Sequence, residues 1–259
     1  MLDSMKLSKS RYIFALVLFS SIHLWLLRVQ HNAASRNSST FTVPNVQSAF
    51  NSNTATITML IDQINLQIVH NFLSAEECTQ LIQYSGTLYE PSVVVNGTDY
   101  VHSSIRESST AVLLPNETSL VSSIESRVAT FANVNINQVE LLQITRYSDS
   151  QQIKQHYDYY PIEHAKRINN QRQYTMLIYL NTVEEEWGGG THFVHFNRTI
   201  QPLRGTALFW RNAFDMYDVD PWTLHIGQPV QQKQKFILSI WFKFNPDVSR
   251  GSIEQVQTY

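Results

Sequence analysis

The sequence predicts a mainly β (α+β) fold, in which a double-stranded β-helix (jelly roll) core has flanking N-terminal helices and is preceded by one transmembrane helix. Three observations support this prediction. A mostly apolar run stands near the N-terminus, two segments with helical periodicity follow a polar stretch, and short alternating runs separated by glycine, proline and asparagine dominate from Val139 onward. The chain has 259 residues, of which 43% are hydrophobic and 12% aromatic, so it can bury one such core.

The N-terminal region predicts a membrane anchor. Residues 1–11 form a short basic tail, and residues 12–29 are mostly apolar and near the length of about 20 residues that a membrane-spanning helix needs. A cleaved secretory signal is the alternative, but the apolar run is longer than the core of such signals and no small-x-small cleavage site follows. The slight excess of positive charge before the run predicts a single-pass type II protein of the endoplasmic reticulum or Golgi membrane, with the folded domain in the lumen.

The rest of the chain divides by composition. Residues 30–60 are mostly polar and rich in serine, asparagine and threonine, which is typical of a flexible stem. The folded domain is expected at 61–247 and a C-terminal tail at 248–259. Sequons suit a lumenal domain, but about three would arise by chance at this composition. The chain has four of them, at Asn37, Asn96, Asn116 and Asn197.

Two helices are predicted before the strands. Ser74 begins the pattern S-A-E-E, a capping box, and is followed by one helical face. That face contains Cys78, Leu81, Ile82 and Ser85. A second helix is expected from Leu120 to Phe131, where apolar residues recur at helical spacing.

Charge and cysteine content exclude several classes of protein. The net charge is −2, and no basic patch with interleaved aromatic residues occurs, so no nucleic-acid partner is expected. Cys78 is the single cysteine, which rules out both an intramolecular disulfide and a zinc site rich in thiolates.

The tripeptide His156-Tyr157-Asp158 and the later His225 are the candidate metal ligands. Residues two apart on a strand point to the same face, so His156 and Asp158 can approach one ion, while His225 must come from another strand. Two imidazoles and one carboxylate hold non-heme Fe(II) and leave coordination positions open. An H-x-D tripeptide alone is weak evidence, because it also occurs as an ordinary hydrogen-bonded pair.

Lys235 begins the predicted strand KFILSIWFKF, residues 235–244. Alternation gives this strand one wholly apolar face and places Lys235, Ser239, Trp241 and Lys243 on the other. A lysine beside aromatic residues commonly extends to water. If Lys235 points into a barrel instead, its charge needs a partner, which a dicarboxylate would supply.

Several segments together resemble the catalytic domain of prolyl 4-hydroxylases (alpha-subunit-like), which are 2-oxoglutarate- and Fe(II)-dependent dioxygenases. The similar segments are residues 68–85, 106–110, 141–160, 173–193, 204–212 and 223–242. They carry, in order, H-x-D, G-G-x-T-x-F, H-x-G-x-P-V and a lysine ten residues beyond the distal histidine. This ordered series is far more specific than any one motif, and it runs from about Ile64 to Asn245.

The resemblance implies roles for individual residues. It implies that His156, Asp158 and His225 bind Fe(II), and that Lys235 pairs with the distal carboxylate of 2-oxoglutarate. Further residues match weaker positions of the family, where packing in the core or exposure to solvent are the alternatives. These are Tyr147 and Thr191, which would help to hold 2-oxoglutarate, and Arg172, Trp241 and Lys243, which would line the substrate site.

Two departures from the family pattern bear on function. Gly190 stands where an acidic residue usually precedes the threonine, with Trp187 before the glycines, and this could alter the loop that covers the site. Lys243 stands where plant and algal members often have histidine, so the peptide preference is expected to differ.

The expected reaction is hydroxylation of peptidyl proline in a proline-rich peptide or protein, with O2 and 2-oxoglutarate consumed, succinate and CO2 released, and ascorbate as a further cofactor. Proline in an extended polyproline II segment suits such a site, since the segment is preformed and its ring carbons face outward. Two alternatives remain open. One is a 2-oxoglutarate oxygenase that acts on another residue or substrate, and the other is a catalytically inactive jelly roll that serves as a binding module.

Overall fold

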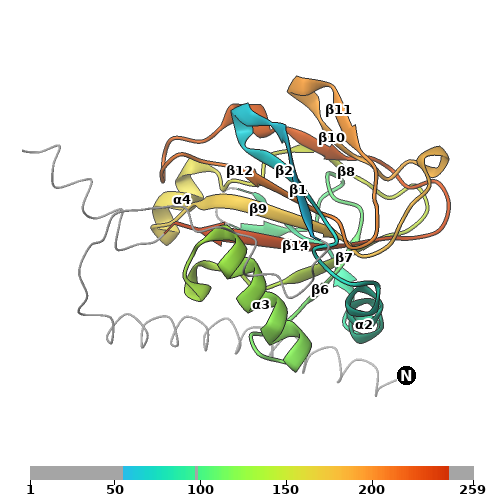
Figure 1. Ribbon diagram of the computed structural model, residues 1–259. Coiled ribbons are helices and arrows are strands. Elements are labelled where there is room, and N and C mark those ends of the chain that lie inside the picture. Colours follow the sequence, from blue (N-terminus) through green and yellow to red (C-terminus); the bar gives the residue numbers. More distant parts are fainter. Residues whose placement is uncertain (1–54, 97–98, 245–259) are drawn as a thin grey trace, which may run out of the picture. The chain divides into compact units, whose positions relative to one another are not determined.

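Two β-sheets face each other in the computed structural model, which describes residues 55–96 and 99–244 (Figure 1). The expected tail at 1–11, membrane segment at 12–29 and C-terminal tail at 248–259 lie outside these residues. Within the part that is described, no helix is long and apolar enough to cross a membrane.

The strands form a large sheet, a small sheet and a hairpin. The large sheet contains β1 (Thr56–Ile61), β2 (Leu66–His70), β3 (Glu90–Pro91), β6 (Ser109–Val112), β7 (Gln143–Tyr147), β9 (Arg172–Tyr179), β12 (Ala207–Arg211) and β14 (Lys235–Lys243). The small sheet contains β8 (Ile153–His156), β10 (Thr191–Phe193), β11 (Arg198–Ile200) and β13 (His225–Gly227), and the hairpin pairs β4 (Val94–Asn96) with β5 (Asp99–Val101). The orders are β1-β2-β12-β9-β14-β7-β6-β3 and β11-β10-β13-β8. This arrangement confirms the mainly β, jelly-roll-like prediction.

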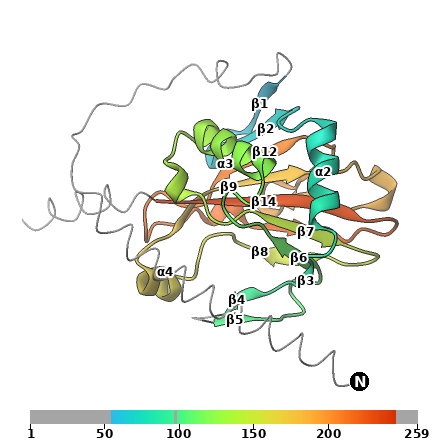
Figure 2. The ribbon, with the colours of Figure 1, turned by 90° about the horizontal axis from the view of Figure 1, so that it is seen from below.

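Helices α2 (Ala75–Ser85) and α3 (Ser119–Ala132) lie on one face of the large sheet, as Figure 2 shows. The capping box that the sequence predicts is formed: Glu77 N donates to Ser74 Oγ at 3.1 Å, and Ser74 N donates to Glu77 Oε2 at 2.8 Å. Each helix buries one apolar face against the strands, and the second helix covers the expected range.

Alternation along the central strands separates two cores. Leu238, Ile240 and Phe242 of β14 pack under the helices. Ile237 points to the other side, into the space between the sheets, and packs with residues from both of them. The same face of β14 carries Lys235, so the predicted division of this strand is confirmed and the lysine faces the interior of the jelly roll.

The structure differs from two expectations. Strand β1 begins at Thr56, inside the segment 30–60 that we expected to be a stem, because TITMLI pairs with β2 although its side chains are largely exposed. Helix α4 (Ile162–Ile168) stands between β8 and β9, where we expected strands to dominate. Its seven residues are too few for helical periodicity to be recognised in the sequence. Short 3-10 helices complete the described chain, at Asp62–Ile64, Ile136–Gln138, Glu185–Trp187, Val194–Phe196 and Pro221–Thr223.

Candidate active site

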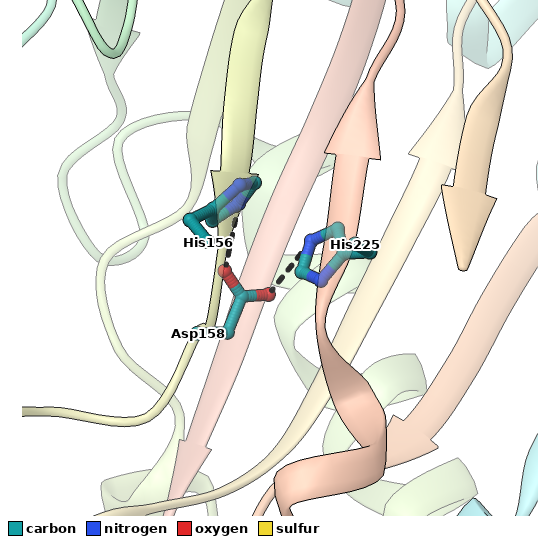
Figure 3. A group of neighbouring side chains, drawn as sticks. All are labelled: His156, Asp158 and His225. Carbon is teal, nitrogen blue, oxygen red and sulfur yellow. Dashed lines mark ion pairs between the residues drawn. The ribbon is translucent and has the colours of Figure 1, made fainter. Parts of the chain in front are cut away.

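Strands β8 and β13 bring two imidazoles together. His156 ends β8 and His225 begins β13, and the antiparallel register makes them direct partners. Oxygens of Asp158 lie 3.5 Å from Nε2 of His156 and 4.0 Å from Nε2 of His225 (Figure 3). One ligand atom from each of the three residues lies within 4.8 Å of the others. The cluster that the sequence predicts is therefore present.

Backbone carbonyls hold both rings in the orientation that a metal site needs. Nδ1 of His156 lies 2.8 Å from the carbonyl oxygen of Lys154, and Nδ1 of His225 lies 2.9 Å from that of Thr223. A carbonyl oxygen only accepts hydrogen bonds, so each Nδ1 must carry the proton. Each Nε2 then turns a free lone pair toward Asp158, as in metal sites whose ligating histidines are oriented by outer hydrogen bonds.

The charges of the cluster favour a bound cation. Burial raises the pKa of Asp158, but the imidazoles of His225 and His156 and the charge of Arg172 outweigh it, so the pKa lies below its ordinary value. Burial and the neighbouring His156 lower the pKa of His225 to about 4, although Asp158 acts in the opposite direction. At neutral pH the carboxylate is charged and His225 is neutral, which are the forms that bind metal. The donor set fits Fe(II).

A cavity of about 540 Å³ opens over the three side chains, and its wall contains Lys235, Tyr147 and Thr191. This volume is ordinary for a small-molecule site, which commonly occupies about 300 to 1,000 Å³. The tyrosine is 3% exposed and the threonine 1% exposed, and the hydroxyl of Tyr179 donates to Thr191 Oγ1 at 2.8 Å. The structure thus brings the expected cosubstrate residues to one cavity with the metal cluster.

Lys235 is buried without a carboxylate partner among the described residues. Its side chain is 2% exposed, and burial lowers its pKa to about 7. The rings of Tyr147 and Tyr179 lie 5.4 and 5.8 Å from Nζ. A buried ammonium is costly to keep without a counter-charge, so the residue is poised for an anionic ligand.

Known proteins share this fold and this part of the sequence. A model of the 2OG-Fe(II) oxygenase superfamily matches residues 142–243. Prolyl 4-hydroxylase 1 of Arabidopsis thaliana is 31% identical over 194 residues, which cover 68% of each chain. Probable prolyl 4-hydroxylase 3 of the same plant is 32% identical over 196 residues, which cover 67% of each chain. This chain belongs to the prolyl 4-hydroxylase-like 2-oxoglutarate oxygenases.

Solved structures agree with this family. The viral collagen prolyl hydroxylase of Paramecium bursaria Chlorella virus-1, in complex with 2-oxoglutarate, has a TM-score of 0.56 and 27% identity, and the match covers 70% of this chain and 96% of that one. A prolyl hydroxylase from Trichoplax adhaerens, bound to a peptide fragment of hypoxia inducible factor, has a TM-score of 0.52. At 16% identity, over 71% of this chain and 87% of that one, the second likeness shows the fold alone.

In this oxygenase Arg172 lines the cavity while pairing with a carboxylate that the sequence did not indicate. Its Nε donates to Glu140 Oε1 at 3.0 Å, and its Nη2 donates to Oε2 at 2.8 Å. The guanidinium also lies over the rings of Trp241, at 3.8 Å, and Tyr160, at 4.4 Å. Burial raises the pKa of Glu140, but Arg172 and Lys243 outweigh it and bring the value to about 2.

Two of the expected substrate residues lie differently with respect to the cavity. Trp241 forms part of its wall. Lys243, at the end of β14, does not line it among the described residues, and its carbonyl oxygen accepts a hydrogen bond from Gln138 at 2.8 Å. The charge of Lys243 helps to lower the pKa of Glu140, which also does not line the cavity among the described residues.

The altered glycine segment, residues 188–190, packs against Lys235. Gly189 has φ +74°, and a Cβ there would lie 3.5 Å from Cδ of Lys235, so the loop covers the aliphatic part of that lysine. A Cβ on Gly190 would lie 2.5 Å from Cγ2 of Thr199 and 2.8 Å from Oε1 of Gln228. An acidic residue therefore has no room at position 190 unless these neighbours move.

Sequence reasoning gave no role to several residues that the tertiary structure brings to the site. Glu140 pairs with Arg172, Thr175 donates to Asp158, and Arg106 lines the cavity and donates to the hydroxyl of Thr145. Residues 106–110 resemble the family, which was the one available signal for Arg106. No local pattern marks the other two, because each meets a partner that is distant in the sequence.

Proposed function

We propose that this oxygenase hydroxylates peptidyl proline, consuming O2 and 2-oxoglutarate and releasing succinate and CO2. One observation carries the proposal: two Nε2 lone pairs and a carboxylate face a cavity whose wall holds a buried lysine that has no carboxylate partner within residues 55–96 and 99–244. In this proposal His156, Asp158 and His225 hold Fe(II). Three protein ligands leave positions for the cosubstrate and for O2.

The protein's share of the chemistry is orientation and charge. Bound Fe(II) supplies the redox chemistry by which one oxygen atom reaches a C–H bond of the substrate. The carbonyl oxygens of Lys154 and Thr223 fix the histidine tautomers, and the charge of Asp158 offsets part of the metal's charge. Burial of Asp158 and His225 limits the access of bulk water to two of the three ligands.

The cosubstrate end of the cavity is assigned to Lys235, Tyr147 and Thr191. A carboxylate of 2-oxoglutarate would give Lys235 a counter-charge, and charge-assisted hydrogen bonds are the strong ones in proteins. The hydroxyls of Tyr147 and Thr191 line the same cavity and can donate to that carboxylate.

Aromatic side chains support a peptide substrate. The rings of Tyr157 and Tyr159 are stacked with centroids 4.6 Å apart, and both line the cavity with Trp241. Polyproline II segments dock on aromatic-lined grooves because they are preformed and apolar. The relatives named prolyl 4-hydroxylase add weight to proline as the target. Ascorbate belongs to the proposal as the reductant that keeps the iron in the Fe(II) state.

A peptide panel tests the proposal against its alternatives. Purified enzyme with Fe(II), 2-oxoglutarate and ascorbate would be incubated with collagen-like and other proline-rich peptides, and succinate and hydroxyproline would be measured. We expect both products, and neither from His225→Ala. Oxidation of another residue would favour the other-substrate alternative. Tight binding of iron and 2-oxoglutarate with no turnover on any peptide would favour the inactive binding module.

We also propose that the domain works in the lumen of the endoplasmic reticulum or Golgi, tethered by residues 12–29. The support is the apolar run and the charge before it. Expression of the full chain in cells, followed by protease treatment of sealed microsomes, tests this. A protected domain is expected, and a protease-sensitive domain would overturn the lumenal location.

A further inference from the structure

Three side chains from separate segments of the chain form a buried series of hydrogen bonds behind the metal cluster. Thr175 Oγ1 donates to Asp158 Oδ2 at 2.8 Å, and Asn212 Nδ2 donates to Thr175 Oγ1 at 2.7 Å. Thr175 is 2% exposed and Asn212 is fully buried. The series therefore links the carboxylate to the large sheet away from solvent.

Hydrogen-bond chemistry gives this series one direction. The hydroxyl of Thr175 has a single proton, and the amide nitrogen of Asn212 can only donate to it. The proton of Thr175 is then left for Asp158. The opposite amide orientation would draw that proton toward Asn212 and set a hydroxyl lone pair against a charged carboxylate. Oδ1 of Asn212 has no hydrogen bond in the described protein. The contact with Thr175 is therefore what determines the orientation of the Asn212 amide.

The hydrogen bond that Thr175 donates distinguishes the two oxygens of Asp158. Each oxygen faces one histidine: Oδ1 lies 3.5 Å from Nε2 of His156, and Oδ2 lies 4.0 Å from Nε2 of His225. Only Oδ2 also accepts the hydrogen bond from Thr175. A donated hydrogen bond draws electron density from Oδ2 and fixes the plane of the carboxylate, so Oδ1 is the better donor to a cation.

The position of Thr175 makes the restraint rigid. It lies in the middle of β9, directly paired with Trp210 of β12 and Trp241 of β14. Its neighbour Met176 packs on the other side of the sheet, under the helices. Thr175 cannot follow a movement of Asp158 without distorting three strands.

We propose that Thr175, oriented by Asn212, is a positioning residue that holds Asp158 as a metal ligand through Oδ1 alone. This inference rests on the metal site of the proposed function, and it does not depend on which substrate is hydroxylated. A carboxylate that bound through both oxygens would occupy one more position on the ion. The hydroxyl thus keeps a position free for the cosubstrate.

The test compares Thr175→Val, which keeps the side-chain shape and removes the hydroxyl, with Thr175→Ser, which keeps the hydroxyl. Thr206→Val is the matched control, because this buried threonine lies outside the cavity. Co(II) would be titrated into each protein without peptide or oxygen, with calorimetry for affinity and visible absorption for coordination. The affinity of the Co(II) protein for 2-oxoglutarate would follow.

We expect Thr175→Val to bind Co(II) about 10-fold to 100-fold more weakly, with an altered spectrum and weaker binding of 2-oxoglutarate. Thr175→Ser and Thr206→Val should behave as the wild type, and Asn212→Leu should fall between. A folded Thr175→Val with wild-type affinity and spectrum would overturn the inference, and Thr175→Ala replaces it if the valine variant does not fold. Failure of the wild type to hydroxylate proline would leave these readouts intact, so the two proposals fail separately.

Discussion

Lys235 and Tyr147 are direct partners across β14 and β7, and Nζ of the lysine lies 5.4 Å from the centroid of the tyrosine ring. A ring face partly compensates a buried cation, by about 2 kcal/mol when the site is desolvated. That is less than a charge-assisted hydrogen bond to a carboxylate can add, so the pair forms one end of an anion site.

Replacing Lys235 should weaken the binding of 2-oxoglutarate but not that of the peptide. In Lys235→Ala we expect the KM for 2-oxoglutarate to rise about tenfold to a hundredfold, which corresponds to the roughly 1.5 to 3 kcal/mol of a hydrogen bond to a charged group. The KM for peptide should change much less. Steady-state kinetics check this, with the exposed Lys166 as the control in Lys166→Ala. An unchanged 2-oxoglutarate dependence in folded Lys235→Ala would remove the assigned role.

The same lysine predicts a pH dependence of cosubstrate binding. Burial lowers the pKa of Lys235 to about 7, so the free protein loses this proton above that pH. The complex needs the charged form, and binding above pH 7 must therefore take up a proton. The affinity for 2-oxoglutarate should fall by up to about tenfold for each pH unit above 7. Calorimetry on the Co(II) protein measures it, and Lys235→Arg should flatten the profile because arginine stays charged.

Metal binding should require all three clustered side chains. Removal of either imidazole or of the carboxylate leaves an incomplete set of donors, so His156→Ala, Asp158→Ala and His225→Ala should each lose nearly all iron-dependent succinate formation. His195, which is exposed and outside the cluster, provides the control variant His195→Ala. Near-normal turnover in His225→Ala would contradict the assignment.

The stacked tyrosines at the cavity predict that replacing one of them changes the KM for peptide but not the KM for 2-oxoglutarate. Tyr159→Leu keeps an apolar side chain but loses the flat ring. The KM for a proline-rich peptide should rise by about tenfold, because aromatic ring packing contributes on the order of 1 kcal/mol. The KM for 2-oxoglutarate should stay the same. Tyr84→Leu, on the exposed side of α2, is the control. Equal peptide kinetics in Tyr159→Leu and the control would exclude a role of the stacked tyrosines in peptide binding.

The ion pair between Glu140 and Arg172 predicts a large effect on stability. Glu140→Ala leaves a buried guanidinium unpaired, which costs about 3 to 5 kcal/mol of unfolding free energy. The double variant Glu140→Leu with Arg172→Met should recover most of it. Because the pKa of Glu140 is lowered from 4.5 to about 2, its contribution is present above pH 4.5 and is lost as the pH falls toward 2. Urea unfolding at several pH values checks both expectations.

Local patterns in the sequence determined much of the fold. The capping box at Ser74 and the helical spacing from Leu120 to Phe131 match α2 and α3, because both signals arise from neighbours within a few residues. Alternation in residues 235–244 predicted how the side chains of β14 divide between two faces, but it left open whether Lys235 points into the barrel. Strand β1 was missed because the polar segment before it resembles a stem, and its pairing with β2 is a tertiary event.

The sequence by itself determined the donor set of the candidate site. His156 and Asp158 stand at the spacing of one strand face, and the order of the later motifs indicated His225 and Lys235. Only the tertiary structure decided how the donors are held. The pairing of β8 with β13 brings the histidines together, and the buried contacts of Glu140 with Arg172 and of Thr175 with Asp158 join residues far apart in the chain. Such contacts leave no periodic trace, because they depend on how distant strands are registered and packed.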